Sequence, residues 1–235
     1  MDEMSKITGR TYRPFVYYGA KDAENIIIAM GSVTETIREV IDYKVAQGEK
    51  VGMVAVHLYR PFSAKYFMEA IPASVKRIAV LDRTKEPGAN GDPLYLDVKE
   101  VFYGKENAPV IVGGRYGLGS KDVTPGQIIG VYKNLAMNEP KNNFTMGIVD
   151  DVTFHSLPVE PEVKVNSDAM YEAKFYGLGS DGTVGANKNS IKIIGGATNK
   201  YCQAYFAYDS KKSGGFTASH LRFGDEPIRS TYLIT

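Results

Sequence analysis

Short, almost continuously apolar runs recur along the first two-thirds of the chain, and the segments between them carry apolar residues at helical spacing. Five runs are typical of strands, at 25–30, 51–58, 77–81, 109–112 and 144–149. Runs of this kind suit strands that are buried on both faces of a parallel sheet. Four helical stretches alternate with them. The alternation predicts an α/β domain with a five-stranded, mainly parallel sheet and helices on both faces.

The carboxyl ends of the predicted strands are one candidate site, because ligands of open parallel sheets usually bind there. The residues at these ends are Gly31-Ser32, Arg60-Pro61, Asp82-Arg83 and 113–115. Ordinary surface loops would have the same appearance in the sequence. The pattern therefore marks one edge of the sheet and leaves both interpretations open.

An acidic, proline-containing stretch at 150–166 separates this pattern from the remainder of the chain. Such composition is typical of a linker between domains. We expect a first domain over 1–158, a linker over 159–166 and a second unit over 167–235.

The second unit has the pattern of a partial α/β unit. Strands are predicted at 173–176, 201–208, 216–223 and 228–234, with a turn at 213–215 and a helix at 184–194. A segment of roughly 70 residues with one helix and a few strands makes a small core. We therefore expect this unit to be truncated and the chain to be an internal piece of a longer protein.

The strongest local motif, Gly-x-Gly-x-x-Gly, lies at Gly177, Gly179 and Gly182, between a predicted strand and a predicted helix. Glycines let the backbone approach a phosphate closely, and the start of a helix directs free N–H groups at it. No acidic residue is well placed about 20 positions later to bind a ribose, which argues against an NAD site and favours another phosphate-bearing ligand. A Walker loop does not fit either, because Lys188 follows Asn187 instead of a glycine. The motif predicts a bend that binds another phosphate-bearing ligand, and a tight turn without a ligand is the alternative.

Composition narrows the function classes. A formal net charge of +1 argues against a general electrostatic grip on nucleic acid or anionic membranes, and no apolar run approaches the length of a membrane span. The single cysteine, Cys202, cannot form an internal disulfide or hold a cluster alone, and it fits a reducing, cytoplasmic location. The three histidines lack metal-ligand spacing. We expect no catalytic residue and no metal site.

Five segments resemble the pyruvate:ferredoxin (flavodoxin) oxidoreductase family. They are AMGSV at 29–33, VHLYRPFS at 56–63, VLDRTKEPG at 80–88, GGRYGLGSK at 113–121 and the long run 175–194. The segments are spread over nearly the whole chain, and several are long and unbroken. By this resemblance the chain is similar to an internal stretch of a large multidomain enzyme.

The resemblance implies that residues 1–158 are similar to the C-terminal domain of transketolase. Residues from 167 onward are similar to the start of the domain equivalent to the gamma subunit of 2-oxoacid oxidoreductases. It further implies a homodimeric parent that converts pyruvate to acetyl-CoA and CO2, reduces ferredoxin or flavodoxin, and uses thiamine diphosphate, Mg2+, 4Fe-4S clusters and coenzyme A. The catalytic domains would lie outside this piece, which is expected to be structural and non-catalytic and to have the other domains of the parent as its partners.

The gamma-like domain is linked in the family to coenzyme A, whose phosphates would suit the glycine motif. The residues to which this binding is carried over are Gly177, Gly179, Ser180, Asp181, Gly182, Thr183, Gly185, Asn187 and Lys188. No other cofactor is expected in this piece. Two rival functions stay open: a free-standing nucleotide- or dinucleotide-binding protein that uses the loop 177–185, and a purely structural spacer between domains.

Overall fold

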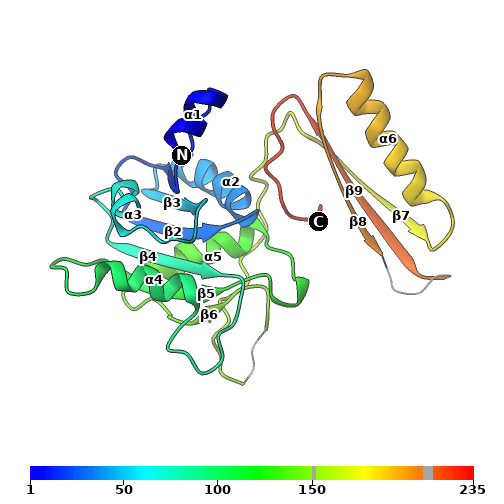
Figure 1. Cartoon of the computed structure of the whole chain (residues 1–235). Helices are drawn as coiled ribbons and strands as arrows, with labels where there is room; N and C mark the ends of the chain where they lie inside the picture. The colour runs from blue at the N-terminus through cyan, green and yellow to red at the C-terminus, as the bar shows by residue number, and fades with distance from the viewer. Residues whose placement is uncertain (150–151, 209–213) are drawn as a thin grey trace. The chain divides into compact units, whose positions relative to one another are not determined.

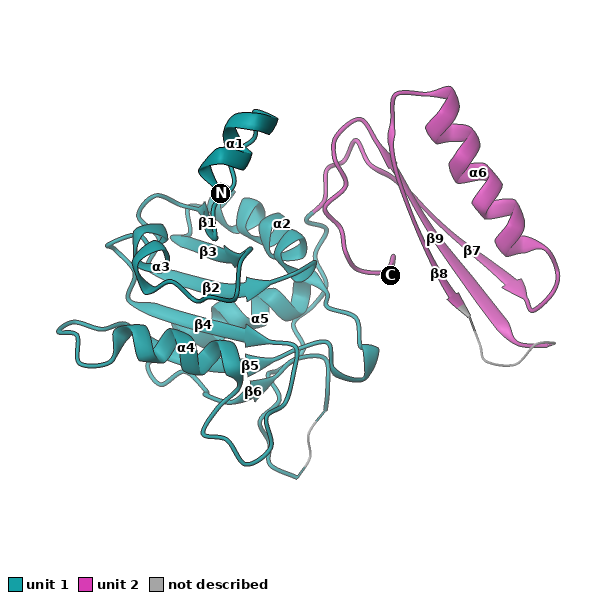
Figure 2. Ribbon diagram, in the orientation of Figure 1, with its two compact units in different colours: residues 1–165 teal, residues 166–235 magenta. Residues whose placement is uncertain are grey.

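The computed structural model describes residues 1–149, 152–208 and 214–235, which form two compact units that divide between Val165 and Asn166 (Figure 2). Each unit contains its own β-sheet. The acidic pair Asp150-Asp151, from the acidic stretch 150–166, and Ser213, from the expected turn, lie outside the described residues.

The sheet of unit 1 has six strands in the order β1-β3-β2-β4-β5-β6 (Figure 1). The strands are β1 (Phe15–Gly19), β2 (Asn25–Met30), β3 (Val51–Val56), β4 (Arg77–Asp82), β5 (Val110–Arg115) and β6 (Phe144–Thr145). All neighbouring pairs are parallel except β1 with β3. The predicted α/β class with a mainly parallel sheet is confirmed, but the predicted number of five strands is wrong.

The additional strand is β1, which pairs with β3 at the edge of the sheet in the antiparallel sense. Only Phe15 of its five residues is buried, and the other four are partly exposed. Its short sequence, FVYYG, therefore lacks the continuous apolar signal of a strand that is covered on both faces.

Helices cover both faces of this sheet, as the alternation predicts. One face carries α2 (Val33–Ala46) and α5 (Pro125–Ala136), and the other carries α3 (Ala64–Ala70) and α4 (Pro93–Phe102) (Figure 1). Two short elements lie outside this arrangement: α1 (Asp2–Thr8), which buries no residue, and the 3-10 turn η1 (Leu118–Ser120), which follows β5.

The side chains of β2 show why both faces need cover. Ile26 and Ile28 belong to the core beneath α3 and α4, whereas Ile27 and Ala29 belong to the core beneath α2 and α5. All four side chains are completely buried. Because successive side chains of a strand point to opposite faces, a run of this composition is stable only between two layers of helices.

Helix ends follow some of their sequence signals. The pair Thr124-Pro125 predicts a helix start, and Thr124 caps α5 by accepting the N–H of Gln127 at 3.5 Å, with Pro125 in the first helical position. Gly48 follows the end of α2 with φ of 83°, the left-handed conformation that glycine favours after a helix. Thr34 is a candidate N-cap of α2 by its residue type, but the helix already begins at Val33, and the Thr34 hydroxyl donates to the Gly31 carbonyl at 2.7 Å.

The chain after β5 differs from expectation in two ways. The predicted strand 144–149 shortens to the two residues of β6, since Gly147 turns the backbone with φ of 70°. The stretch 159–165, expected within the linker, lies along α5: Glu162 accepts the N–H of Gly126 at 3.1 Å, and Val163 and Val165 pack against the core.

Unit 2 is a three-stranded antiparallel sheet in the order β7-β9-β8 with one long helix. Its elements are β7 (Tyr171–Leu178), α6 (Thr183–Ala197), β8 (Tyr201–Tyr208) and β9 (Phe216–Gly224). The helix and three of the strands agree with the sequence patterns. In the described part of the chain, no helix is long and apolar enough to cross a membrane.

The predicted strand at 228–234 is wrong, because this segment joins neither sheet. Side chains of β9 bind its backbone instead. Arg222, which is 1% exposed, donates from Nη1 to the Tyr232 carbonyl at 2.6 Å. His220 Nδ1 accepts the N–H of Ile234 at 3.1 Å. Hydrogen bonds to side chains thus replace the backbone ladder that a strand would need.

Substitution of Gly114 tests the packing between β5 and β6. A Cβ at Gly114 would overlap the buried ring of Phe144, so we expect Gly114→Ala to lower the free energy of unfolding by about 1–3 kcal/mol. Gly130→Ala is the matched control within α5, because the nearest atom to its Cβ would be the Pro158 carbonyl oxygen at 3.4 Å. Helix propensity should make the control neutral or more stable by up to about 1 kcal/mol. Urea unfolding measures both, and equal stabilities would contradict the described packing.

Candidate functional site

The glycine motif forms a tight bend between β7 and α6, and the carboxylate of Asp181 closes it. Oδ1 accepts the N–H of Thr183 at 2.8 Å, and Oδ2 accepts the N–H of Leu178 at 2.9 Å. Oδ2 also accepts the Thr183 hydroxyl at 2.8 Å. One of the free N–H groups at the start of α6 is therefore satisfied by the chain itself.

These contacts set the charge of the bend. Hydrogen bonds from the N–H and hydroxyl of Thr183, together with the N–H of Leu178, hold the pKa of Asp181 below its ordinary value although desolvation opposes them. Asp181 is consequently ionised at neutral pH. Its negative charge lies at the positive end of the α6 dipole, where it is favourable.

Three glycines of the motif region, Gly177, Gly182 and Gly185, differ in backbone conformation and in the space around them. Gly177 lies inside β7, and a Cβ there would approach the Thr183 Oγ1 within 2.6 Å. Gly182 precedes α6 with φ of 87°, which favours glycine. At Gly185 a Cβ would meet nothing within 4 Å, so the surface beside the first turn of α6 is open.

The remaining expected residues divide between the bend and the helix. Gly179 donates its N–H to the Gly215 carbonyl at 2.6 Å, and Ser180 has φ of 69° within the bend. Asn187 lies further along α6 and is 5% exposed, and its Nδ2 has no hydrogen-bond partner among the residues that the structure describes. The Nζ atom of Lys188 lies 5.4 Å from the centroid of the Phe206 ring on β8. The structure therefore gathers 177–185 at the bend but holds the Lys188 ammonium over β8.

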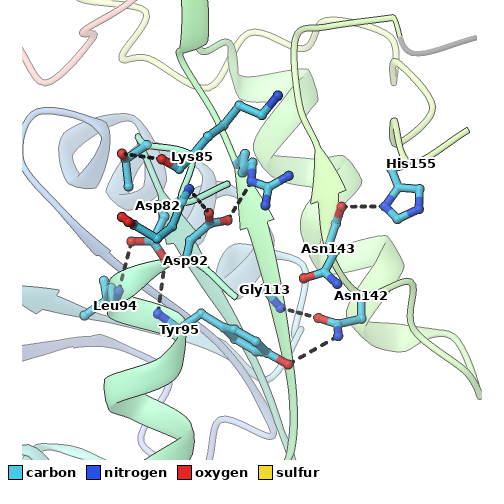
Figure 3. A network of polar contacts seen from close by, with 12 residues as sticks. Asp82, Lys85, Asp92, Leu94, Tyr95, Gly113, Asn142, Asn143 and His155 are labelled. Atoms are coloured by element: carbon cyan, nitrogen blue, oxygen red, sulfur yellow. Dashed lines mark hydrogen bonds and ion pairs between the residues drawn. The ribbon is translucent and has the colours of Figure 1, made fainter. Parts of the chain in front are cut away.

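The carboxyl ends of β4 and β5 form a second candidate site, in unit 1. Asp82 at the end of β4 joins the sheet to α4: Oδ1 accepts the N–H of Leu94 at 3.0 Å and Oδ2 accepts the N–H of Tyr95 at 3.1 Å (Figure 3). A carboxylate from the preceding strand thus caps α4. Burial raises the pKa of Asp82, the two N–H groups oppose this shift, and the nearby charge of Asp92 adds to it.

Asp92 occupies the N-cap position of α4 but makes no capping hydrogen bond. Its Oδ1 accepts the N–H of Glu86 at 3.2 Å, and its Oδ2 accepts Arg115 Nε at 2.7 Å. The Asp92 side chain is 6% exposed and that of Arg115 is 23% exposed. The buried carboxylate therefore anchors one edge of the Arg115 guanidinium.

A cavity of about 570 Å³ lies beside this ion pair. We define the strand-end cavity by six of its lining residues: Lys85, Asn90, Arg115, Asn143, Thr145 and His155. Lys85, Asn143 and His155, three of these residues, are labelled in Figure 3. The sequence pattern marks 113–115 at this edge but carries no signal for Asn143 or His155, which follow β5 by many residues.

The other two predicted strand ends are engaged by the chain's own side chains. The order of the parallel strands reverses between β2 and β4, where ligands often bind. There the buried Tyr116 donates its hydroxyl to the Met30 carbonyl at 3.1 Å. Arg60 lies over the ring of Tyr59, 3.8 Å from its centroid, and pairs with Asp97 at 2.8 Å.

The buried carboxylate of Asp82 predicts a pH-dependent effect of Asp82→Asn. Asparagine offers one acceptor oxygen to two N–H groups, so we expect a loss of about 1 kcal/mol in the free energy of unfolding near pH 7. A raised pKa means that the folded state binds this proton more tightly than the unfolded state does. The part of the stability that is linked to protonation of Asp82 is fully present below its ordinary pKa of 3.8 and is lost as the pH rises through the pKa of the folded state.

The difference in the free energy of unfolding between the wild type and the less stable Asp82→Asn should therefore grow as the pH falls from about 7 towards about 4. Chemical unfolding at several pH values measures it. Glu106→Gln, in the exposed turn after α4, is the control. A deficit that shrinks on acidification would contradict a raised pKa at Asp82.

Each of the two units contains a segment that matches a known protein family. Residues 23–128 match the family described as "Pyruvate:ferredoxin oxidoreductase core domain II", and residues 172–235 match "Pyruvate ferredoxin/flavodoxin oxidoreductase". In the described residues, no group of three or more His, Cys, Asp or Glu side chains is arranged to hold a metal ion.

Curated relatives cover the whole chain. A pyruvate-flavodoxin oxidoreductase of Enterobacter agglomerans is 62% identical over 235 residues, and the pyruvate:ferredoxin oxidoreductase of Moorella thermoacetica is 57% identical over 234 residues. A solved structure, a 2-oxoglutarate:ferredoxin oxidoreductase from Magnetococcus marinus, is 18% identical with a TM-score of 0.40, over 57% of this chain and 21% of its own. That likeness is too low to bear on function.

The chain spans 20% of the length of both curated relatives. The sequence identity to both relatives extends along the whole chain. The two matched family descriptions both name pyruvate:ferredoxin oxidoreductases, and their matched ranges follow one another along the chain. The chain therefore belongs to the pyruvate:ferredoxin/flavodoxin oxidoreductase family, of whose curated members it spans about a fifth.

Proposed function

We propose that this chain is a non-catalytic part of an enzyme that oxidatively decarboxylates pyruvate to acetyl-CoA and CO2. The observation that carries the proposal is the 62% identity to a pyruvate-flavodoxin oxidoreductase along the whole chain. In this proposal, unit 1 is a transketolase C-terminal-like domain and unit 2 begins a gamma-subunit-like domain. The parent is a cytoplasmic homodimer that passes electrons to ferredoxin or flavodoxin.

The parent's redox and decarboxylation chemistry belongs to thiamine diphosphate with Mg2+ and to 4Fe-4S clusters. The residues of this chain do not fit a cluster, which needs several thiolates. The one cysteine, Cys202, lies in β8 with its Sγ 3.5 Å from the Lys200 carbonyl oxygen. We assign these cofactors to other parts of the parent.

Coenzyme A is the ligand that we propose for the glycine bend. The Asp181 carboxylate accepts a hydrogen bond from the N–H of Thr183. The first backbone hydrogen bond of α6 runs from the Ala186 N–H to the Gly182 carbonyl at 3.0 Å. The N–H groups of 184 and 185 lie between these two and have no carbonyl partner within a helix.

The open surface at Gly185 supports this proposal, because a phosphate could approach these two N–H groups without meeting a side chain. Lys188 would add positive charge if its ammonium left the Phe206 ring. Asp181 then serves to hold the shape of the bend, and the phosphate is bound on the side of Gly185.

Gly185→Asp tests the coenzyme A proposal. The new carboxylate has room, suits the first turn of α6 electrostatically and repels a phosphate at the same place. We expect coenzyme A to bind the wild-type chain, with amide NMR shifts at 177–188, and to bind Gly185→Asp at least about tenfold more weakly.

Gly196→Asp, at an equally open position near the other end of α6, should bind coenzyme A like the wild type. Equal binding by Gly185→Asp would overturn the coenzyme A site. Tighter binding of NAD, FAD or ATP at the same residues would favour a free-standing nucleotide-binding protein. No response to any of these ligands would favour a purely structural spacer.

The non-catalytic part of the proposal has its own test. The chain is expected to give no ferredoxin reduction with pyruvate, thiamine diphosphate, Mg2+ and coenzyme A, because it supplies no group that stabilises the carbanion formed on decarboxylation. Absorbance of reduced ferredoxin measures turnover, with a complete pyruvate:ferredoxin oxidoreductase as the positive control. Turnover by this chain alone would overturn the assignment.

A further inference from the structure

We infer that the strand-end cavity of unit 1 is a second anion site, which binds a small molecule through a phosphoryl group. This site belongs to a different unit from the glycine bend, and the inference does not rest on the coenzyme A proposal. Its volume of about 570 Å³ lies within the range of small-molecule sites and exceeds the space that a bare phosphate needs.

The charge of the cavity lining is positive. Lys85 and Arg115 line it, and none of the lining residues within the ranges 1–149, 152–208 and 214–235 is an Asp or Glu. Lys85 is exposed, and its Nζ makes no hydrogen bond or ion pair within the described ranges. Two cationic head groups around one hollow favour binding of a dianion.

Arg115 is held ready for such a ligand. Its Nε donates to Asp92, whose side chain is 6% exposed, at 2.7 Å. The carboxylate binds one edge of the guanidinium, and the terminal nitrogens stay available because they have no other partner within the described ranges. A guanidinium fixed in this way can bind a phosphoryl group through its fork, while Lys85 supplies a mobile point charge.

Neutral donors complete the lining. Asn90 and Asn143 contribute amides and Thr145 contributes a hydroxyl. The His155 ring is fixed by a 2.9 Å contact between Nδ1 and the Asn143 carbonyl oxygen (Figure 3). Thr145, like Arg115, lies in a strand of the sheet, which fixes the position of its backbone, and the other groups come from loops beside the strand ends.

The position in the fold agrees with this reading. Ligands of parallel sheets bind at the carboxyl ends of the strands, usually where the strand order reverses. In unit 1 that point lies between β2 and β4, and the Tyr116 hydroxyl occupies it by bonding to Met30. The open space is therefore displaced along the same edge to β4, β5 and β6, where the strand-end cavity lies.

Titration of the complete 235-residue chain with inorganic phosphate and with glycerol 3-phosphate tests this inference. At constant ionic strength we expect saturable amide NMR shifts at Asn90, Gly91, Asn143 and Thr145, with Kd in the millimolar range or below. Glycerol 3-phosphate should bind at least as tightly as phosphate, since the cavity has room for the glycerol. Acetate at equal concentration should bind more weakly, because it carries one charge.

Lys85→Gln should weaken phosphate binding by about fivefold without changing the fold, because Lys85 is exposed and its Nζ makes no hydrogen bond or ion pair within the described ranges. Lys105→Gln, at an exposed position after α4, is the matched control and should bind like the wild type. Three results would each overturn the inference: no saturable shifts, equal weakening by both substitutions, or shifts confined to 177–188. The last result would leave the coenzyme A proposal intact, and failure of coenzyme A binding would leave the strand-end cavity intact.

Discussion

The burial of both faces of the parallel sheet is the constraint on which the rest of unit 1 depends. Ile26, Ile27 and Ile28 are all completely buried, although successive side chains of a strand point to opposite faces. Each parallel neighbour can be reached only through a crossover, which places helices on the two faces. The carboxyl ends of these strands consequently meet at one edge, and the polar side chains that cannot lie within the sheet collect there.

At that edge the chain compensates two buried carboxylates in different ways. The start of α4 compensates Asp82 through two N–H groups, and the guanidinium of Arg115 compensates Asp92. A buried charge without such partners would be costly. Both carboxylates have hydrogen-bond partners in the interior. Lys85 and the terminal nitrogens of Arg115 therefore give the lining of the strand-end cavity its positive charge.

Unit 2 relies on polar side chains for a similar reason: its core is small. The buried guanidinium of Arg222 donates to Glu172 at 2.6 Å, to Gln203 at 3.0 Å and to the Tyr232 carbonyl at 2.6 Å. It thereby fixes the last segment of the chain against β9 without a strand. At the other end of the unit, the carboxylate of Asp181 closes the glycine bend, so the turn is shaped before any ligand binds.

The sequence by itself determined the α/β class, the positions of most helices and strands, the bend at the glycine motif and the family resemblance. Each of these depends on residues that are close together in the chain, whose spacing and composition carry the signal. Only the tertiary structure decided the features that join distant segments: the edge strand β1, the cap of α4 by Asp82, the cavity shared by Lys85 and His155, and the docking of 228–234 without a strand. The physical reason is that burial and hydrogen-bond partners are set by contacts across the fold, and a local pattern does not specify them.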